Sequence, residues 1–402
     1  MKTTTFKSAL KTGNGLKREL IRSVFWTVFL TVLFLLFNGS VNRWHDVLIS
    51  LPFFIVLYFL FFSIGKEVVS SGIKKWIGSD ILRMLVFPFV LLVLYIIYVL
   101  LNQQNPIQGA IALVPYLVIF PWLLFLVRRY RTKKIDWLDF TIFVIFLLFT
   151  NFIKVEPSGN LPFAGKDFGS VYKIALMLIA VYTFGTIRGL DDIGFVPVLN
   201  LKYLWTAIWV WFVFYLFVVV VGYSVNFIKY IGHESVTNEL IAKIGLTLVV
   251  TFLNTAIFEE LFFRGILQNM LMKRIGQAKS WKIFWLCGLL ISIPLAFLVG
   301  YTLKGGMQWF PALMVMLIFI AAGLIERVGK NSSGVYTALA ITSTIFGLVH
   351  YHSGAIIYIG FACVAGWAYG YTYIKTKNVF YSVIVHTLVN SSVLIFGLEF
   401  VK

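Results

Sequence analysis

Hydrophobic runs recur along the whole chain, and a helix needs about 20 apolar residues to cross the hydrocarbon core of a membrane. The runs lie near residues 21–37, 47–64, 82–101, 111–127, 138–153, 171–187, 204–228, 241–272, 283–301, 309–325, 336–350, 355–374 and 379–397. Their residues do not alternate between polar and apolar, as those of a transmembrane β-barrel strand do. The sequence therefore predicts an all-α protein, a polytopic transmembrane helix bundle of about 12–13 spans.

The composition excludes the soluble classes of protein. Of the 402 residues, 60% are hydrophobic and only 12% are charged, whereas roughly 25% of the residues in soluble domains are charged. So few charged side chains could not cover the surface of a water-soluble fold of this length. We expect an integral membrane protein that lies in a lipid bilayer.

The net charge of +18 indicates membrane topology rather than a nucleic-acid partner. Much of the excess lies in short loops between the apolar runs, for example at Lys66, Lys74 and Lys75 and again at Lys273 and Arg274. Lys and Arg collect in the cytoplasmic loops of membrane proteins. We therefore predict that the N-terminus is cytoplasmic and that the chain binds no nucleic acid.

The two halves of the chain differ in character. Residues 1–170 form an N-terminal hydrophobic multi-span region with no ionisable residue deep in a span. This region suits contact with a membrane-protein partner through apolar helices, and the sequence assigns it no other role. Residues 188–197 form a polar, turn-rich connector. The second region, residues 185–402, includes this connector and carries polar residues inside three apolar spans. We expect the chemistry in this second region.

Two adjacent carboxylates, Glu259 and Glu260, lie in an apolar helix predicted over about residues 240–274. Ionised groups at membrane depth are costly and usually functional. Glu260 and Arg264 are four residues apart and can pair on one helix face, whereas Glu259 lies about 100° around the helix and lacks that partner. A desolvated, unpaired carboxylate suits general acid or base catalysis. The alternative is a salt bridge at the cytoplasmic edge.

Two histidines lie in later apolar spans. His350 follows Phe346 by one helical turn, and His386 precedes Asn390 by one turn. His386 and Asn390 can donate two hydrogen bonds to one point and so form an oxyanion hole. The alternatives are structural, because a lone histidine such as His350 is more often a core or interfacial residue. The pair His386 and Asn390 is equally typical of a polar clamp between membrane helices.

Together these residues form a hydrolytic site if their helices converge. In such a site, Glu259 activates a water molecule with help from His350. His386 and Asn390 then stabilise the tetrahedral oxyanion.

The three motifs resemble those of the CPBP family of membrane proteases. This family comprises the CAAX-processing type II endopeptidases and the bacteriocin-processing or abortive-infection proteins. Its hallmarks EExxxR, FxxxH and HxxxN stand here as Glu259-Glu260 with Arg264, Phe346 with His350, and His386 with Asn390. The stretches 263–268, 366–371 and 375–378 are also similar, and the resemblance covers about residues 185–402.

The resemblance implies an all-α bundle around a polar cavity and an intramembrane glutamic endopeptidase. Such an enzyme hydrolyses a peptide bond of a membrane-associated protein or peptide without an acyl-enzyme and without a cofactor. The residues that carry over as catalytic are Glu259, His350, His386 and Asn390, and those that carry over as supporting are Glu260, Arg264 and Phe346. A bacterial plasma membrane is the location that the resemblance favours.

The interval between Glu259 and His350 is longer than is usual in the family. We interpret the excess as a two-span insertion near residues 283–330 within the protease domain. An even number of added spans leaves the orientation of the later helices unchanged. The active-site geometry could therefore survive, while the cavity wall or substrate gate could differ.

Three other functions fit part of the pattern. A zinc-dependent variant of the same hydrolysis could use two histidines and a glutamate, but no HExxH arrangement is present, and Asn390 is a poor zinc ligand. Cys287 and Cys363 both lie in apolar segments and indicate no metal cluster. A non-catalytic membrane partner, either an immunity protein or a scaffold, would need none of the candidate catalytic residues. A transporter would show repeated halves, which the motifs do not.

Overall fold

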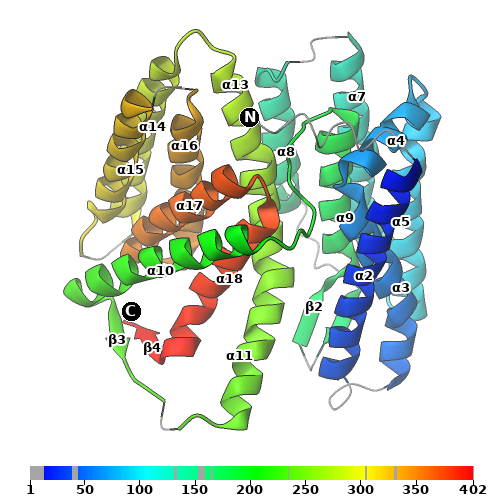
Figure 1. Ribbon diagram of the computed structural model, residues 1–402, viewed down its shortest axis with the longest axis horizontal. Helices are drawn as coiled ribbons and strands as arrows, with labels where there is room; N and C mark the ends of the chain where they lie inside the picture. Colours follow the sequence, from blue (N-terminus) through cyan, green and yellow to red (C-terminus); the bar gives the residue numbers. More distant parts are fainter. Residues whose placement is uncertain are drawn as a thin grey trace. The chain divides into compact units, whose positions relative to one another are not determined.

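The computed structural model describes residues 13–38, 44–130, 134–152, 159–163, 166–233, 235–303, 306–329 and 333–401. The chain divides into two compact units, Met1–Val198 and Leu199–Lys402. Within the described residues almost all regular structure is helical, with two small two-stranded sheets (Figure 1). The predicted all-α polytopic membrane class is confirmed.

Fewer described helices than the predicted 12–13 spans have the length and apolarity of a membrane span. Each predicted segment coincides with a described helix, although residue 153 lies outside the described residues. Nine of the described helices are long and apolar enough to cross a membrane, rather than about 12–13. The apolar helices Trp137–Phe149 and Val171–Ile187 are shorter than those nine. Helix α16 has only 14 residues, and α17 is long enough but contains several Gly, Tyr and Thr residues.

The first unit is a bundle of helices with one short hairpin. Its elements are α2 (Gly13–Asn38), α3 (Trp44–Ile64), α4 (Glu67–Ile77), α5 (Ile81–Leu101), α6 (Ile107–Val114), η2 (Pro115–Ile119), α7 (Phe120–Tyr130), α8 (Trp137–Phe152), β1 (Asn160–Phe163), β2 (Lys166–Ser170), α9 (Val171–Ala180) and η3 (Val181–Ile187). The unit holds a buried ion pair that the sequence pattern did not single out. Asp139, in the first turn of α8, pairs with Arg188 at 2.9 Å between Oδ2 and Nη2. Both side chains are almost fully buried, so the two charges compensate one another away from water.

The second unit carries all the candidate site residues. Its elements are α10 (Leu201–Ser224), β3 (Ile228–Tyr230), α11 (Asn238–Val250), η4 (Thr251–Ala256), α12 (Ile257–Glu260), η5 (Leu261–Gln268), α13 (Asn269–Gly276), α14 (Trp281–Thr302), α15 (Phe310–Val328), α16 (Val335–Leu348), η6 (Val349–Ser353), α17 (Ile356–Thr376), α18 (Val379–Phe396) and β4 (Leu398–Phe400). The predicted span 204–228 ends earlier, at Ser224, because the chain turns there into the strand β3.

One helical rod of 39 residues, Asn238–Gly276, passes through the second unit from α11 to α13 (Figure 1). The Thr237 hydroxyl caps its start by accepting a hydrogen bond from the backbone N–H of Leu240. Two π-helical stretches, η4 and η5, flank the short α-helical segment α12. Such stretches are frequent at functional sites because they turn side chains out of the regular register.

Glycines allow α16 to approach α17 closely. A Cβ added at Gly347 would lie 2.5 Å from the backbone nitrogen of Cys363, and one added at Gly366 would lie 2.9 Å from the Cα of Ser343. Small residues bring membrane helices into such close contact. This packing fixes the end of α16, which carries Phe346 and leads into η6 with His350.

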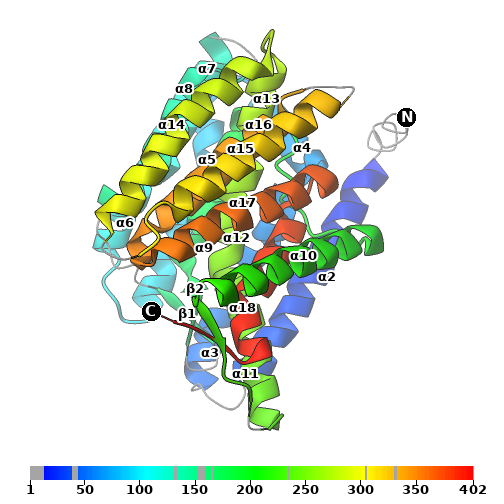
Figure 2. The same ribbon diagram turned by 90° about the vertical axis from the view of Figure 1, so that its left-hand side faces the viewer.

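Two long helices, α14 and α15, occupy the region predicted as an insertion and pack side by side (Figure 2). Residues 304, 305 and 330 of this region lie outside the described residues, and its status as an insertion stays a prediction. The carboxylate of Glu326 on α15 is buried and accepts hydrogen bonds from the backbone N–H groups of Gly334, Tyr336 and Thr337, at 2.7–3.3 Å. Helix α15 therefore caps the N-terminus of α16.

Both small sheets are antiparallel, with β1 paired to β2 and β3 paired to β4. In the second sheet Ile228 lies opposite Phe400, and Lys229 lies opposite Glu399. The sequence analysis predicted none of these strands, because three to five residues are too few to show the alternation of a strand.

Candidate active site

Glu260 and Arg264 form the buried base of the site. The Arg264 Nε donates to Glu260 Oε2 at 3.0 Å, and neither side chain has any solvent exposure. This is the pair expected from the spacing of four residues. The contact persists although Arg264 lies in the π-helical stretch η5.

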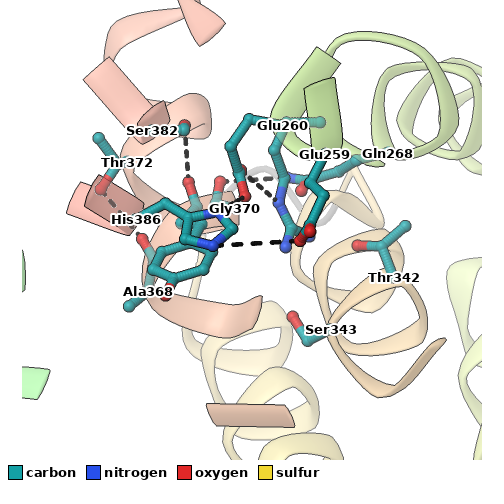
Figure 3. Close-up of polar contacts among 12 residues, drawn as sticks. Glu259, Glu260, Gln268, Thr342, Ser343, Ala368, Gly370, Thr372, Ser382 and His386 are labelled. Carbon is teal, nitrogen blue, oxygen red and sulfur yellow. Dashed lines mark hydrogen bonds and ion pairs between the residues drawn. The ribbon is translucent and has the colours of Figure 1, made fainter. Parts of the chain in front are cut away.

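His386 of α18 lies between the two adjacent glutamates. Its Nδ1 is 3.0 Å from Glu260 Oε1, and its Nε2 is 4.0 Å from Glu259 Oε2. Figure 3 shows the imidazole reaching toward both carboxylates. Since a carboxylate oxygen accepts, the Glu260 contact places a proton on Nδ1 and aims Nε2 at Glu259. The contact between His386 and Glu260 was not predicted.

Aromatic rings enclose the charged groups. The Arg264 guanidinium carbon lies 5.0 Å from the ring centre of Phe346, close enough for a cation–π contact. Tyr369 stacks on His386 with the ring centres 4.5 Å apart and the planes at 12°. These rings hold Arg264 and His386 in single orientations and exclude water from the pair beneath.

Glu259 differs from Glu260 in solvent exposure and in hydrogen bonding. Its side chain is 27% exposed, whereas that of Glu260 is 0% exposed. Its Oε2 has no hydrogen-bond partner among the described residues. Oxygen Oε2 is itself buried, so it is a buried acceptor whose hydrogen bond no described residue supplies.

His350 and Asn390 complete the set of predicted residues. The Nδ1 of His350 is 2.7 Å from the carbonyl oxygen of Phe346, one turn earlier. Because a carbonyl oxygen only accepts, Nδ1 carries the proton, and Nε2 of the neutral ring presents its lone pair. Asn390 is exposed on α18, one turn beyond His386.

A cavity of about 360 Å³ brings Glu259, His350, His386 and Asn390 together. Glu260 and Arg264 do not line it and lie behind His386. Much of the remaining wall is aromatic, from Phe214, Tyr215, Phe227, Tyr358, Phe361 and Phe400. An apolar cavity with a few convergent polar groups is typical of a binding site.

The sequence analysis missed several residues that shape the site. Gln268 is buried and donates to the carbonyl oxygen of Gly370 at 3.1 Å, which ties η5 to α17. Tyr358 and Tyr369 line the cavity. Gln268 and Tyr369 lie in stretches that resemble the family, but buried or aromatic residues of an apolar helix look like ordinary packing residues, so the sequence assigned them no role.

The absence of a metal cofactor stays a prediction. Among the described residues, no three His, Cys, Asp or Glu side chains lie close enough to hold one metal ion. A protein zinc site takes at least three such ligands. We derive no step through a metal.

Comparison with protein families found a similarity to a protease family. The model of the type II CAAX prenyl endopeptidase Rce1-like family matches residues 241–327 and 319–392. The comparison with curated proteins gave no match, and neither did the comparison with solved structures. The matched stretches contain all three motifs and every residue of the polar part of the cavity. Residues 241–392 of this integral membrane protein are therefore similar to the type II CAAX prenyl endopeptidase Rce1-like family.

Proposed function

We propose that the chain is an intramembrane endopeptidase that hydrolyses a peptide bond with a water molecule activated by Glu259. The observation that carries this proposal is the state of Glu259. It lines the cavity, its Oε2 has no hydrogen bond among the described residues, and His386 Nε2 lies 4.0 Å from that oxygen. A carboxylate in that position can accept a proton from water.

In the proposed reaction, Glu259 takes a proton from water while the water oxygen bonds to the substrate carbonyl carbon. The carbonyl oxygen becomes an oxyanion. The intermediate collapses when the amide nitrogen receives the proton from Glu259 and the C–N bond breaks. The products are a carboxylic acid and an amine, and Glu259 returns to its carboxylate form.

The other residues divide into two groups. His350 and Asn390 face the cavity, where the His350 Nε2 can accept a hydrogen bond from the attacking water and the Asn390 amide can donate to the oxyanion. When His386 carries both ring protons, its Nε2–H is a second donor for the oxyanion. Glu260 and Arg264 act through His386, because Glu260 holds Nδ1 and Arg264 compensates the charge of Glu260.

The proposed substrate is a membrane-associated protein or peptide. The aromatic wall of the cavity favours an apolar substrate segment. A prenylated C-terminal peptide is one candidate, since the family description names such substrates. A leader peptide, a pheromone and a bacteriocin are others. We place the chain in a bacterial plasma membrane with a cytoplasmic N-terminus.

The test compares peptides released from the host membrane proteome by wild type and by Glu259→Gln, measured by mass spectrometry at matched expression. Gln keeps the size of the side chain and removes the base. Glu239→Gln, at an exposed site on the same helical rod, is the matched control. Fragments that vanish only with Glu259→Gln support the protease and name its substrate. Identical profiles, together with a phenotype on deletion, would favour a scaffold or immunity partner acting through residues 1–170.

A further inference from the structure

The sheet of β3 and β4 forms part of the cavity wall. Phe227 and Ile228, at the start of β3, and Phe400 on β4 all line the cavity. Phe400 is 6.3 Å from Tyr358 between ring centres, and Tyr358 is 6.0 Å from His350. Two ring contacts therefore connect β4 to a candidate catalytic histidine.

Strand β3 is firmly anchored. The N–H of Phe227 donates to the carbonyl of Gly222 at 2.8 Å, and Ile228 is only 3% exposed. Ile228 packs so closely on α10 that a Cβ at Gly222 would lie 2.6 Å from its Cδ1. This strand keeps its place whether or not another strand pairs with it.

Strand β4 has three residues, and among the described residues it pairs only with β3; a sheet of two such strands is marginal by itself. At its two ends the N–H groups of Ile231 and Gly232 donate to the Gly397 carbonyl, and that of Val401 donates to the Phe227 carbonyl. The ion pair between Lys229 and Glu399 is 2.7 Å long, but the two side chains are 55% and 52% exposed, so it adds little. Beyond it, the Phe400 ring stacks on Phe227 at 5.1 Å. A competing peptide strand could displace these contacts.

We propose that β3 binds an extended segment of the substrate as an antiparallel strand, in the place that β4 occupies in this structure. Peptides commonly add to a sheet in this way, with main-chain hydrogen bonds for affinity and alternate side chains for specificity. The register between β3 and β4 predicts which substrate residues would bind best opposite β3. The residue opposite Ile228 turns its side chain into the cavity, as Phe400 does, and a large apolar or aromatic residue fits there.

The neighbouring position favours an acidic residue. The residue opposite Lys229 faces the other side of the strand, and in β4 it is Glu399. Opposite charges directly across a strand pair attract, and like charges repel. The preferred segment is therefore an acidic residue followed by an aromatic one. This inference adds a peptide-binding strand to the proposed peptidase, and it rests on the proposed function.

A reversible disulfide tests the exchange of strands. Lys229→Cys and Glu399→Cys face each other in the ladder at a Cα separation of about 4.5–5.5 Å, which a disulfide can bridge. Cys287→Ser removes the exposed native thiol, and Glu259→Gln prevents hydrolysis of the probe. The probe is a fluorescein-labelled peptide, Gly-Leu-Glu-Phe-Val, and its binding is measured by fluorescence anisotropy with the full chain in detergent.

We expect the reduced form to bind the peptide and the oxidised form to bind at least tenfold more weakly. The two forms are the same molecule, so a folding defect cannot produce this difference. Equal binding by both forms, or no binding by the reduced form, would overturn the proposal. Because the readout is binding, the result stands whether or not the Glu259→Gln comparison reveals a peptidase.

A charge exchange tests the register in the chain with its natural Glu399. Wild type should bind the Glu peptide about two- to fivefold more tightly than the same peptide with Lys in place of Glu. Lys229→Glu should reverse that order. An unchanged order of affinities would refute the pairing with Lys229.

Discussion

The adjacent residues Glu259 and Glu260 should respond to substitution in opposite ways. We predict that Glu260→Ala mainly lowers the free energy of unfolding, whereas Glu259→Gln abolishes peptide release with little change in stability. The prediction follows from their contacts. Glu260 is fully buried between Arg264 and His386, and Glu259 is partly exposed in the cavity.

The size of the effect can be worked out from these contacts. Glu260 accepts two hydrogen bonds of 3.0 Å, one from Arg264 and one from His386. Removal of one partner of a buried ion pair costs about 3–5 kcal/mol, because the other charge stays buried without compensation. For Glu259→Gln, which removes only an ion pair of 4.0 Å, we expect a loss below about 1 kcal/mol.

Thermal unfolding of the purified chain in detergent measures the difference. In a domain of roughly 200 residues, each kcal/mol moves the midpoint by about 2–4 °C, so Glu260→Ala should lower it by about 6–20 °C. The double variant Glu260→Leu with Arg264→Met should be more stable than Glu260→Ala, since it leaves no unpaired buried charge. The reasoning fails if Glu260→Ala melts within about 2 °C of Glu259→Gln, or if the double variant is the least stable of the three.

Three further predictions concern the supports of the site. Gly347→Ala should cost about 1–3 kcal/mol in unfolding free energy, because the new Cβ would lie 2.1 Å from the Cys363 sulfur; Gly245→Ala, with nothing within 4 Å, should leave the melting midpoint unchanged or raised. Glu326→Ala should lower the midpoint by about 2–10 °C, because three N–H groups of α16 lose their acceptor; an unchanged midpoint would contradict the cap. A zinc chelator should leave the Glu259-dependent release of peptides unchanged, because no three-ligand cluster exists among the described residues; loss of release that added zinc restores would refute the metal-free mechanism.

Helical periodicity carried much of what the sequence predicted. Apolar runs located the helices, and a spacing of four residues predicted the pair of Glu260 and Arg264, which the structure has at 3.0 Å. The catalytic roles of Glu259, His350, His386 and Asn390 stay predictions. Their shared cavity makes those roles testable as one site.

Helical periodicity could not predict contacts between residues that are far apart in the sequence. Residues 260 and 386 lie 126 positions apart, and a helical pattern shows only which residues share a face of one helix. The strands β3 and β4 escaped notice for a related reason. Each has three residues at the end of a long apolar run, which are too few to show the alternation of a strand.

The two glutamates make different contacts with one shared histidine. Periodicity alone gives Glu260 a cation and leaves Glu259 without one, but it does not say what either carboxylate contacts elsewhere. His386 Nδ1 lies 3.0 Å from Glu260 and Nε2 lies 4.0 Å from Glu259. The distance of 3.0 Å is a hydrogen bond, which fixes the ring, and 4.0 Å is too long for one. In the proposed reaction Glu259 accepts a proton from water while His386 stays in place. Arg264 would then act indirectly, because it holds Glu260, which in turn contacts the imidazole that faces Glu259.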